Sequence, residues 1–140
     1  MESVYTTEAR STGSARDGRA YLTDRTLEIQ MGLVEELGGN GDGANPEQLF
    51  ALGYATCFHQ AVKIVAGNDR ADATGSSVQA RVHLYMDDDG NYNLAIDIAV
   101  SLPFVEMDRA REIAARAHSA CPYSRATRGN IDVKVTVVEQ

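Results

Sequence analysis

Residues 45–66 read NPEQLFALGYATCFHQAVKIVA, and they predict the central element of the fold. Asn45 can accept hydrogen bonds from the unpaired amides of a first helical turn, Pro46 suits the first helical position, and Glu47 complements the positive end of the helix dipole. The stretch therefore predicts a helix from Pro46 to about Ala66. Its apolar side chains occupy nearly the whole circumference of a helix, which indicates a central helix buried on most sides.

The segment before this helix has the pattern of a β-meander. Residues 4–10 and 27–31 are rich in β-prone side chains, and Asp17-Gly18 between them is typical of a hairpin turn. The glycine-dense residues 38–43 predict one mobile loop between a strand and the helix.

The segment after the helix predicts two strands, a second helix and a last strand. Apolar and polar residues alternate over 78–86 and again over 94–100, which is the pattern of half-buried strands. Residues 105–120 predict the second helix, and Pro122 is expected to stop it. Residues 131–137 carry apolar side chains on one face and predict the last strand. Together, the predicted strands and helices indicate an α+β fold in which antiparallel strands pack on two helices.

Length and charge narrow the class of protein. A chain of 140 residues without an internal repeat fits a single domain over residues 1–140. Its formal net charge of −7 argues against nucleic acid as a partner, because binding to phosphates needs clustered Lys and Arg. The N-terminus lacks the basic and apolar parts of an export signal, and no apolar run approaches a bilayer span. We therefore expect a cytoplasmic protein that does not bind a membrane.

The two cysteines, Cys57 and Cys121, are the residues best suited to carry chemistry. Free cysteine is among the most buried residue types, so either one alone is more often structural. A reactive cysteine must be a thiolate, and Cys57 is too far from a helix N-terminus, while Cys121 lies at a negative C-terminal end. A reactive sulfur here needs a nearby cation. The candidates are Arg10, Arg16, Arg19, Lys63, Arg125 and Arg128.

The three histidines, His59, His83 and His118, do not predict a metal site. His59 is two residues from Cys57 on a helix, so the two side chains point apart. His118 precedes Cys121 by three residues and can share its face, where it could cap the helix end or ease formation of a thiolate. We therefore expect no bound metal.

Two longer motifs resemble the signatures of the organic hydroperoxide resistance branch of the OsmC/Ohr family. The first is NPEQLF (45–50) followed by GYATCF (53–58), and the second is CPYS (121–124) followed by ATRGNI (126–131). The turn at residues 16–18, Arg-Asp-Gly, matches the arginine turn of that family. The resemblance covers nearly the whole chain in order and spacing, which is far more specific than an isolated cysteine motif.

The resemblance implies a fold and an activity. The fold would be an OsmC/Ohr-like α+β homodimer, intertwined, with antiparallel sheets around two central helices. The activity would be a thiol-dependent peroxidase that reduces alkyl or lipid hydroperoxides to alcohols. Cys57 would attack the peroxide, become a sulfenic acid and condense with Cys121 to a disulfide, so their Cα atoms must come within about 7 Å. Arg16 would lie beside the Cys57 sulfur and lower its pKa, and Glu47 would orient Arg16.

The resemblance also implies how the enzyme is recycled. The reductant would be a dihydrolipoyl-type dithiol on a lipoylated protein, with no bound cofactor. The chain departs from the family pattern at His59, Gln60 and Arg125, which bears on the pocket and on the charge near Cys121. Candidates for an apolar substrate lining are Phe50, Phe58, Phe104 and Tyr123.

The spacing of Glu47 and Cys57 adds an inference of its own. The two residues are ten positions apart on one predicted helix, hence roughly 15 Å apart along its axis. A single arginine guanidinium can hardly contact both Glu47 and Cys57. If the helix is continuous, the Glu47 beside a given Cys57 comes from a second subunit, which predicts an obligate homodimer with shared sites.

Two alternatives stay open. One is an osmotically inducible OsmC-type peroxidase of broader substrate range, which shares the fold and the cysteine pair. The other is a redox sensor whose cysteines signal and do not turn over. Sensing predicts one oxidation per protein, whereas catalysis predicts repeated peroxide loss.

Overall fold

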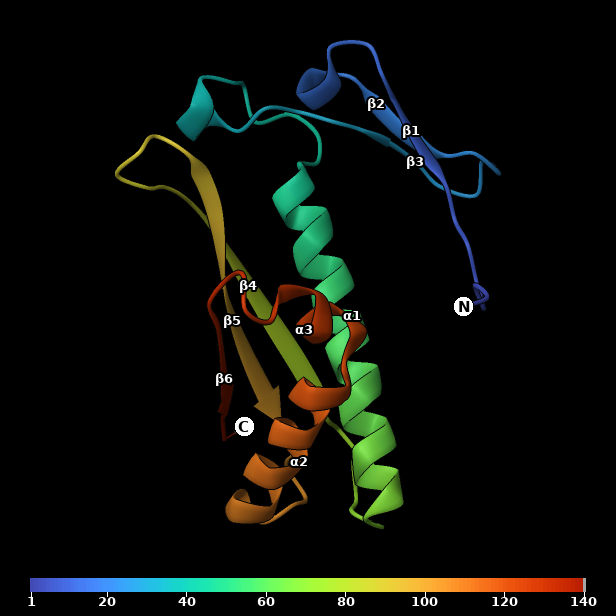
Figure 1. The fold of residues 1–140 in the computed structure, drawn as a ribbon, viewed down its shortest axis with the longest axis vertical. Coiled ribbons are helices and arrows are strands. Elements are labelled where there is room, and N and C mark those ends of the chain that lie inside the picture. Colours follow the sequence, from blue (N-terminus) through green and yellow to red (C-terminus); the bar gives the residue numbers. More distant parts are fainter. Residues whose placement is uncertain (140) are drawn as a thin grey trace. The chain divides into compact units, whose positions relative to one another are not determined.

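The computed structural model describes residues 1–139, which form strands, three α-helices and two short 3-10 turns (Figure 1). The strands are β1 (Ala9–Thr12), β2 (Arg19–Leu22), β3 (Glu28–Gln30), β4 (Ser77–Met86), β5 (Tyr92–Ser101) and β6 (Val133–Val137). The helices are α1 (Pro46–Asn68), α2 (Met107–Ala120) and α3 (Pro122–Thr127), and the 3-10 turns are η1 (Ala15–Asp17) and η2 (Glu35–Leu37). Contacts divide the chain into two compact units, Met1–Leu49 and Phe50–Gln140. The expected α+β class is confirmed, while the single domain stays a prediction.

The N-terminal unit contains an antiparallel sheet in the order β1-β2-β3. The β-meander is therefore confirmed, but its strands differ from those predicted. The first strand begins at Ala9, and β2 was not predicted. Val4 and Tyr5 are β-prone yet almost fully exposed, because β-propensity measures packing against neighbours and these residues have no partner strand among residues 1–139.

The glycine-rich segment before α1 is a loop, as predicted, and it folds back on the chain. The Gly39 amide donates to the Val34 carbonyl at 2.9 Å, and the Gly41 amide donates to the Leu33 carbonyl at 3.0 Å. A Cβ at Gly39 would lie 1.9 Å from the Leu33 carbonyl oxygen, so only glycine permits this approach. The mobility of the loop stays a prediction.

The second unit contains a sheet in the order β4-β5-β6. Strands β4 and β5 pair antiparallel from Ser77 opposite Ser101 to Met86 opposite Tyr92. Strand β6 pairs parallel to β5, so the expectation of an all-antiparallel arrangement is wrong for this strand. The reason is the connection: α2 and α3 lie between β5 and β6, and a helical crossover returns the chain to the same end of the sheet.

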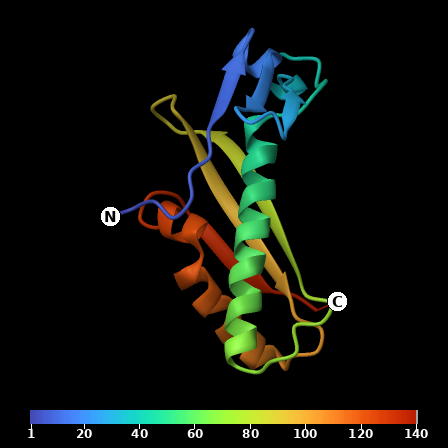
Figure 2. The ribbon, with the colours of Figure 1, turned by 90° about the vertical axis from the view of Figure 1, so that its right-hand side faces the viewer.

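Helices α1 and α2 cover one face of this sheet (Figures 1 and 2). The side chains between the helices and the sheet form the core. The largest of them are Tyr54, Phe58 and Val62 from α1, Ile96, Ile98 and Val100 from β5, and Ile113 from α2. Two helices packed on strands were predicted, and this packing is confirmed.

Helix α1 buries one stripe and exposes another, so the prediction that it is buried on most sides is wrong for the single chain. Leu52 is 66% exposed and Ile64 is 54% exposed, although both are apolar. A helix packed on one sheet can bury only the side that faces it. By length and composition α1 could also cross a membrane, contrary to expectation, but core helices of soluble proteins meet the same test.

Helix α2 ends where predicted, but Pro122 does more than stop it. The N-terminus of α2 is capped by Glu106, whose carboxylate accepts from the amides of Asp108 and Arg109. Cys121 is extended, and Pro122 is the first residue of α3. Proline lacks an amide hydrogen, which the first helical position does not need, so it starts a helix as well as it ends one.

Candidate active site

The structure brings the two cysteines together. Cys57 lies in the middle of α1, and Cys121 lies at the junction of α2 and α3. Both are free, and the two Sγ atoms are 3.6 Å apart. Cys121 is fully buried, while Cys57 is half-buried. The two sulfurs that the family resemblance pairs are therefore close together, while the expected Cα separation stays a prediction.

The surroundings of Cys57 favour a thiol over a thiolate. Burial raises the pKa of Cys57 above its ordinary value, and the nearby thiol of Cys121 raises it further. The backbone amide of Tyr123 hydrogen bonds to the Cys57 sulfur and lowers the pKa, but burial has the larger effect. These contacts alone leave Cys57 protonated at neutral pH, so a nucleophilic role needs a cation in addition.

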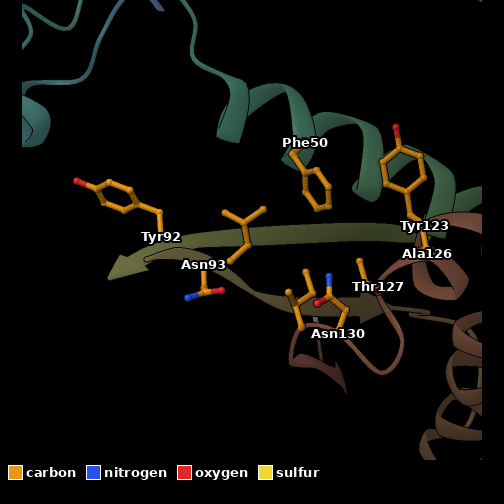
Figure 3. A pocket seen from close by; sticks show the side chains of 9 residues that line it. Phe50, Tyr92, Asn93, Tyr123, Ala126, Thr127 and Asn130 are labelled. Atoms are coloured by element: carbon orange, nitrogen blue, oxygen red, sulfur yellow. The ribbon is translucent and has the colours of Figure 1, made fainter. Parts of the chain in front are cut away.

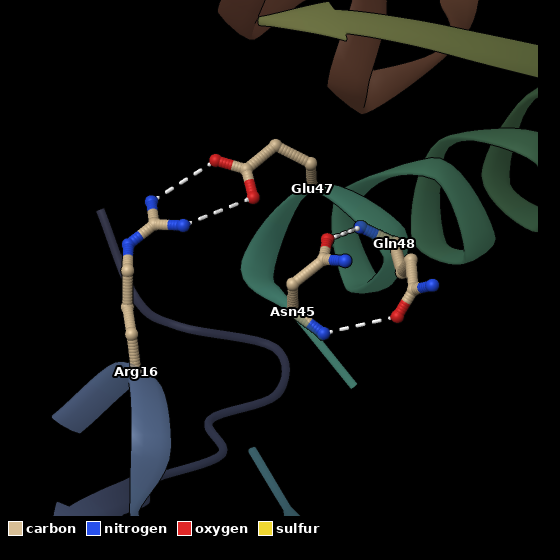
Figure 4. Close-up of polar contacts among 4 residues, drawn as sticks. All are labelled: Arg16, Asn45, Glu47 and Gln48. Atoms are coloured by element: carbon tan, nitrogen blue, oxygen red, sulfur yellow. Dashed lines mark hydrogen bonds and ion pairs between the residues drawn. The ribbon is translucent and has the colours of Figure 1, made fainter. Parts of the chain in front are cut away.

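Arg16 and Glu47 form a two-pronged ion pair within the N-terminal unit (Figure 4). The guanidinium donates from Nη1 to Oε2 at 3.2 Å and from Nη2 to Oε1 at 3.0 Å. The hydrogen bonds from Arg16 hold the pKa of Glu47 below its ordinary value. The pairing of these residues was predicted, and the structure shows it. The predicted contact of Arg16 with Cys57 would join the two units and stays a prediction.

Local structure holds both members of this ion pair. Helix α1 starts with a capping box in which the Asn45 side chain accepts from the Gln48 amide at 2.8 Å and the Gln48 side chain accepts from the Asn45 amide at 3.0 Å (Figure 4). This places Glu47 in the first turn. Asp17 accepts from the Leu33 amide at 2.9 Å and so anchors the turn that carries Arg16.

A cavity of about 570 Å³ opens between the start of α1, α3 and β5 in the second unit (Figure 3). Phe50 and Tyr123 line it, as proposed from the sequence. The other two candidates were wrong, since Phe58 is fully buried in the core and Phe104 is 66% exposed elsewhere. The remaining lining residues are Tyr92, Asn93, Leu94, Ala126, Thr127, Asn130 and Ile131.

Tyr123 links this cavity to the sulfur pair. Its ring lines the cavity 5.9 Å from the Phe50 ring, measured between centroids, and its backbone amide contacts the Cys57 sulfur. Gly53 makes room for it, because a Cβ there would lie 2.7 Å from the Tyr123 hydroxyl oxygen. The glycine in the GYATCF motif therefore has a packing reason that the sequence alone did not reveal.

Buried hydroxyl groups lie on the segments that carry the cysteines, and sequence reasoning missed them. The Tyr54 hydroxyl is 2.8 Å from Ser124 Oγ and 3.3 Å from Thr127 Oγ1. His118 Nδ1 is also 2.8 Å from Ser124 Oγ. The expectation that His118 caps the end of α2 is wrong, because the Arg128 guanidinium caps it by donating to the His118 carbonyl at 2.7 Å. Burial, and then the charge of Arg128, lower the pKa of His118, so its ring is neutral at pH 7.

Each of the other two histidines has one hydrogen-bond partner within residues 1–139. His59 Nε2 is 2.9 Å from Ser76 Oγ, and His83 Nε2 is 2.9 Å from the Asp97 carboxylate. Over residues 1–139, no group of three or more His, Cys, Asp or Glu side chains is placed to hold a metal ion.

The fold and the site define a class of protein: an α+β domain in which a half-buried thiol on a central helix faces a second, buried thiol. The family described as OsmC-like protein matches residues 39–136. An organic hydroperoxide resistance protein from Xanthomonas axonopodis pv. citri is 40% identical over 136 residues, which cover 96% of this chain and 94% of the relative. This chain therefore belongs to the OsmC/Ohr family, in its organic hydroperoxide resistance branch, as the motifs indicated.

Solved structures agree with this assignment. An organic hydroperoxide resistance protein from Elizabethkingia anophelis superimposes with a TM-score of 0.93 and 37% identity, covering 100% of both chains. The organic hydroperoxide resistance protein OhrB of Bacillus subtilis has a TM-score of 0.87 and 33% identity, covering 97% of this chain and 100% of its own. The OsmC/Ohr-like fold is thereby confirmed.

Proposed function

We propose that this protein is a cysteine-based peroxidase that reduces organic hydroperoxides to alcohols. The observation that carries the proposal is the 3.6 Å separation of the Cys57 and Cys121 sulfurs. The relatives named for organic hydroperoxide resistance support the substrate class. A half-buried thiol next to a fully buried thiol suits a pair in which the first meets the peroxide and the second resolves it.

The proposed reaction has two steps. The Cys57 thiolate attacks one peroxide oxygen, the O–O bond breaks, and the alkoxide leaves and takes up a proton to become the alcohol. Cys57 is now a sulfenic acid. Cys121 then attacks the Cys57 sulfur, the S–O bond breaks, and the hydroxide leaves as water with the proton of the Cys121 thiol. The two thiols together supply the two electrons that the peroxide gains.

Activation of Cys57 is assigned to Arg16, oriented by Glu47. Because burial raises the pKa of Cys57, a guanidinium beside the sulfur would restore the thiolate and polarise the peroxide. Helix α1 is continuous from Pro46 to Asn68, so Glu47 and Cys57 lie roughly 15 Å apart along it. We propose a homodimer in which the Arg16–Glu47 ion pair of one subunit lies beside Cys57 of the other subunit and activates it. The exposed Leu52 and Ile64 give α1 an apolar side suited to packing between subunits.

The cavity lined by Phe50 and Tyr123 is the proposed place for the organic tail of the substrate. Its aromatic and aliphatic side chains favour alkyl or lipid hydroperoxides over hydrogen peroxide, since an apolar wall stabilises an apolar tail. Tyr123 contributes both to this wall and to the contact with Cys57, so a tail bound there would lie beside the nucleophile.

The regeneration step needs an external dithiol. We propose a dihydrolipoyl group carried by a lipoylated protein, acting in the cytoplasm, with no bound cofactor or metal. Nucleic acid and membrane have no part in this cycle. A dithiol is suited to the task because its second thiol displaces the first from the mixed disulfide with the enzyme.

Mass spectrometry after one equivalent of tert-butyl hydroperoxide tests the proposal. We expect a Cys57–Cys121 disulfide in the wild type, a sulfenic acid trapped by dimedone in Cys121→Ser, and neither product in Cys57→Ser. Repeated peroxide loss with dihydrolipoamide would exclude a sensor that oxidises once. A rate on hydrogen peroxide equal to that on the organic hydroperoxide would instead favour the broader OsmC-type enzyme.

A further inference from the structure

A buried hydrogen-bonded cluster joins the two segments that carry the cysteines. Ser124 Oγ lies 2.8 Å from the Tyr54 hydroxyl and 2.8 Å from His118 Nδ1, so it bridges α1 and the end of α2. Tyr54 and Ser124 are both 0% exposed, so neither can exchange its partner for water. The tyrosine, serine and histidine together are called the Ser124 bridge.

The members of the Ser124 bridge lie close to the two cysteines in sequence. Tyr54 precedes Cys57 by three residues on α1, which places both on neighbouring positions of one helix face. Ser124 follows Cys121 by three residues in α3. The bridge therefore closes on the same two segments whose sulfurs are 3.6 Å apart.

Packing alone does not require these polar groups. The Tyr54 ring already contacts the rings of Phe50, Phe58 and Tyr123, and a phenylalanine would keep those contacts. A buried hydroxyl contributes little net stability, because forming its bond first requires stripping it of water. What a hydrogen bond adds is a defined length and direction, which fixes how α3 sits on α1.

We propose that the Ser124 bridge is a positioning device that holds Cys121 against Cys57, so that an oxidised Cys57 is trapped as a disulfide before a second peroxide reaches it. This inference rests on the proposed function. In the trapped path the S–O bond of the sulfenic acid breaks and water leaves. In the competing path a second peroxide transfers an oxygen to the sulfenic sulfur, which becomes a sulfinic acid while the peroxide is reduced to alcohol. Both paths start from the same sulfenic acid, so the position of Cys121 decides between them.

The test compares Tyr54→Phe and Ser124→Ala with matched controls, Tyr85→Phe on β4 and Ser119→Ala on α2. Both control side chains are exposed, and the Ser119 hydroxyl donates to the Ala115 carbonyl, which is not part of the bridge. Rapid mixing with tert-butyl hydroperoxide gives the rate of sulfenic acid formation and the rate of disulfide closure. We expect the bridge variants to slow closure by about three- to tenfold, the ratio for one lost hydrogen bond, and to leave sulfenic acid formation within about twofold. The sulfinic fraction under excess peroxide should rise in the same variants and not in the controls.

Unchanged closure in both bridge variants would overturn the inference. So would an equal loss in both steps, because that result indicates general disorder of the site. Thiol–disulfide equilibrium in a glutathione buffer gives a second measurement that needs no peroxide. There we expect the bridge variants to lower the equilibrium constant for the Cys57–Cys121 disulfide by about three- to tenfold. If the wild type forms no sulfenic acid, the proposed function fails, while this equilibrium still tests whether the bridge positions Cys121.

Discussion

The two pairs of candidate site residues are held by opposite physical means. Arg16 and Glu47 meet near the surface, with side chains 42% and 18% exposed, and full charges attract them through two hydrogen bonds. Cys57 and Cys121 meet inside the second unit with no charge between them, because the packing of α1, α2 and α3 leaves their sulfurs in contact. Charge is carried where water can stabilise it, and the thiols lie where water is scarce.

This difference bears on the function proposed for the two pairs. Partial burial raises the pKa of Cys57, whereas the partly exposed Arg16 carries a charge but has no reducing group. In the proposed enzyme, the Arg16–Glu47 pair activates Cys57 of the thiol pair. Substitutions made in each region separately therefore test whether the two pairs depend on different interactions.

The largest expected effect is on the core beneath the thiols. Phe58 is fully buried next to Cys57, and Phe58→Ala should lower the free energy of unfolding by about 3–5 kcal/mol through lost burial and a cavity. Phe104→Ala is the matched control, since Phe104 is 66% exposed and its loss should change stability by about 0.5 kcal/mol or less. Urea unfolding of both variants measures this. Equal losses of unfolding free energy in the two variants would show that the burial of Phe58 does not stabilise the core around Cys57.

The next effect concerns the charge proposed to act on Cys57. Arg16→Met should lower kcat/KM for an organic hydroperoxide by about a hundredfold and raise the apparent pKa of Cys57 alkylation, because the thiolate loses its cation. Arg19→Met is the control, since Arg19 also pairs with a carboxylate, Glu28, in the same unit. If both variants lose the same activity, the loss comes from general charge and not from a specific guanidinium.

A smaller effect is expected at the start of α1. Asn45→Ala removes the side chain that accepts from the Gln48 amide and should lower the free energy of unfolding by about 1 kcal/mol. Gln60→Ala, at an exposed position of the same helix, should have little effect. Thermal unfolding compares the two. Should the Gln60 variant lose as much, a general effect of substitution in α1 and not the loss of the cap would explain the result.

The smallest effect is the pH dependence contributed by Glu47. Arg16 lowers the pKa of Glu47 in the folded protein, so the ion pair stabilises the fold above the ordinary value of 4.5 and this contribution disappears as pH falls through the lowered pKa. Because Arg16 is 42% exposed, the contribution at neutral pH should stay below about 1 kcal/mol. The stability difference between wild type and Glu47→Gln should shrink on acidification. A difference that grows would reverse the assigned sign.

Local patterns in the sequence determined much of this protein. The start of α1 follows from Asn45 and Pro46, and the pairing of β4 with β5 follows from their alternation, because each depends on residues close in the chain. The motifs around Cys57 and Cys121 were enough to indicate the family.

How distant segments meet depends on the packing of the folded chain and not on local patterns. Strand β6 runs parallel to β5 because two helices return the chain across the sheet, and α1 leaves Leu52 and Ile64 exposed because one sheet covers one side of a helix. The hydrogen bond between Tyr54 and Ser124 joins residues 70 positions apart. Composition and periodicity describe near neighbours, whereas these contacts arise from packing between elements, which no short window of sequence contains.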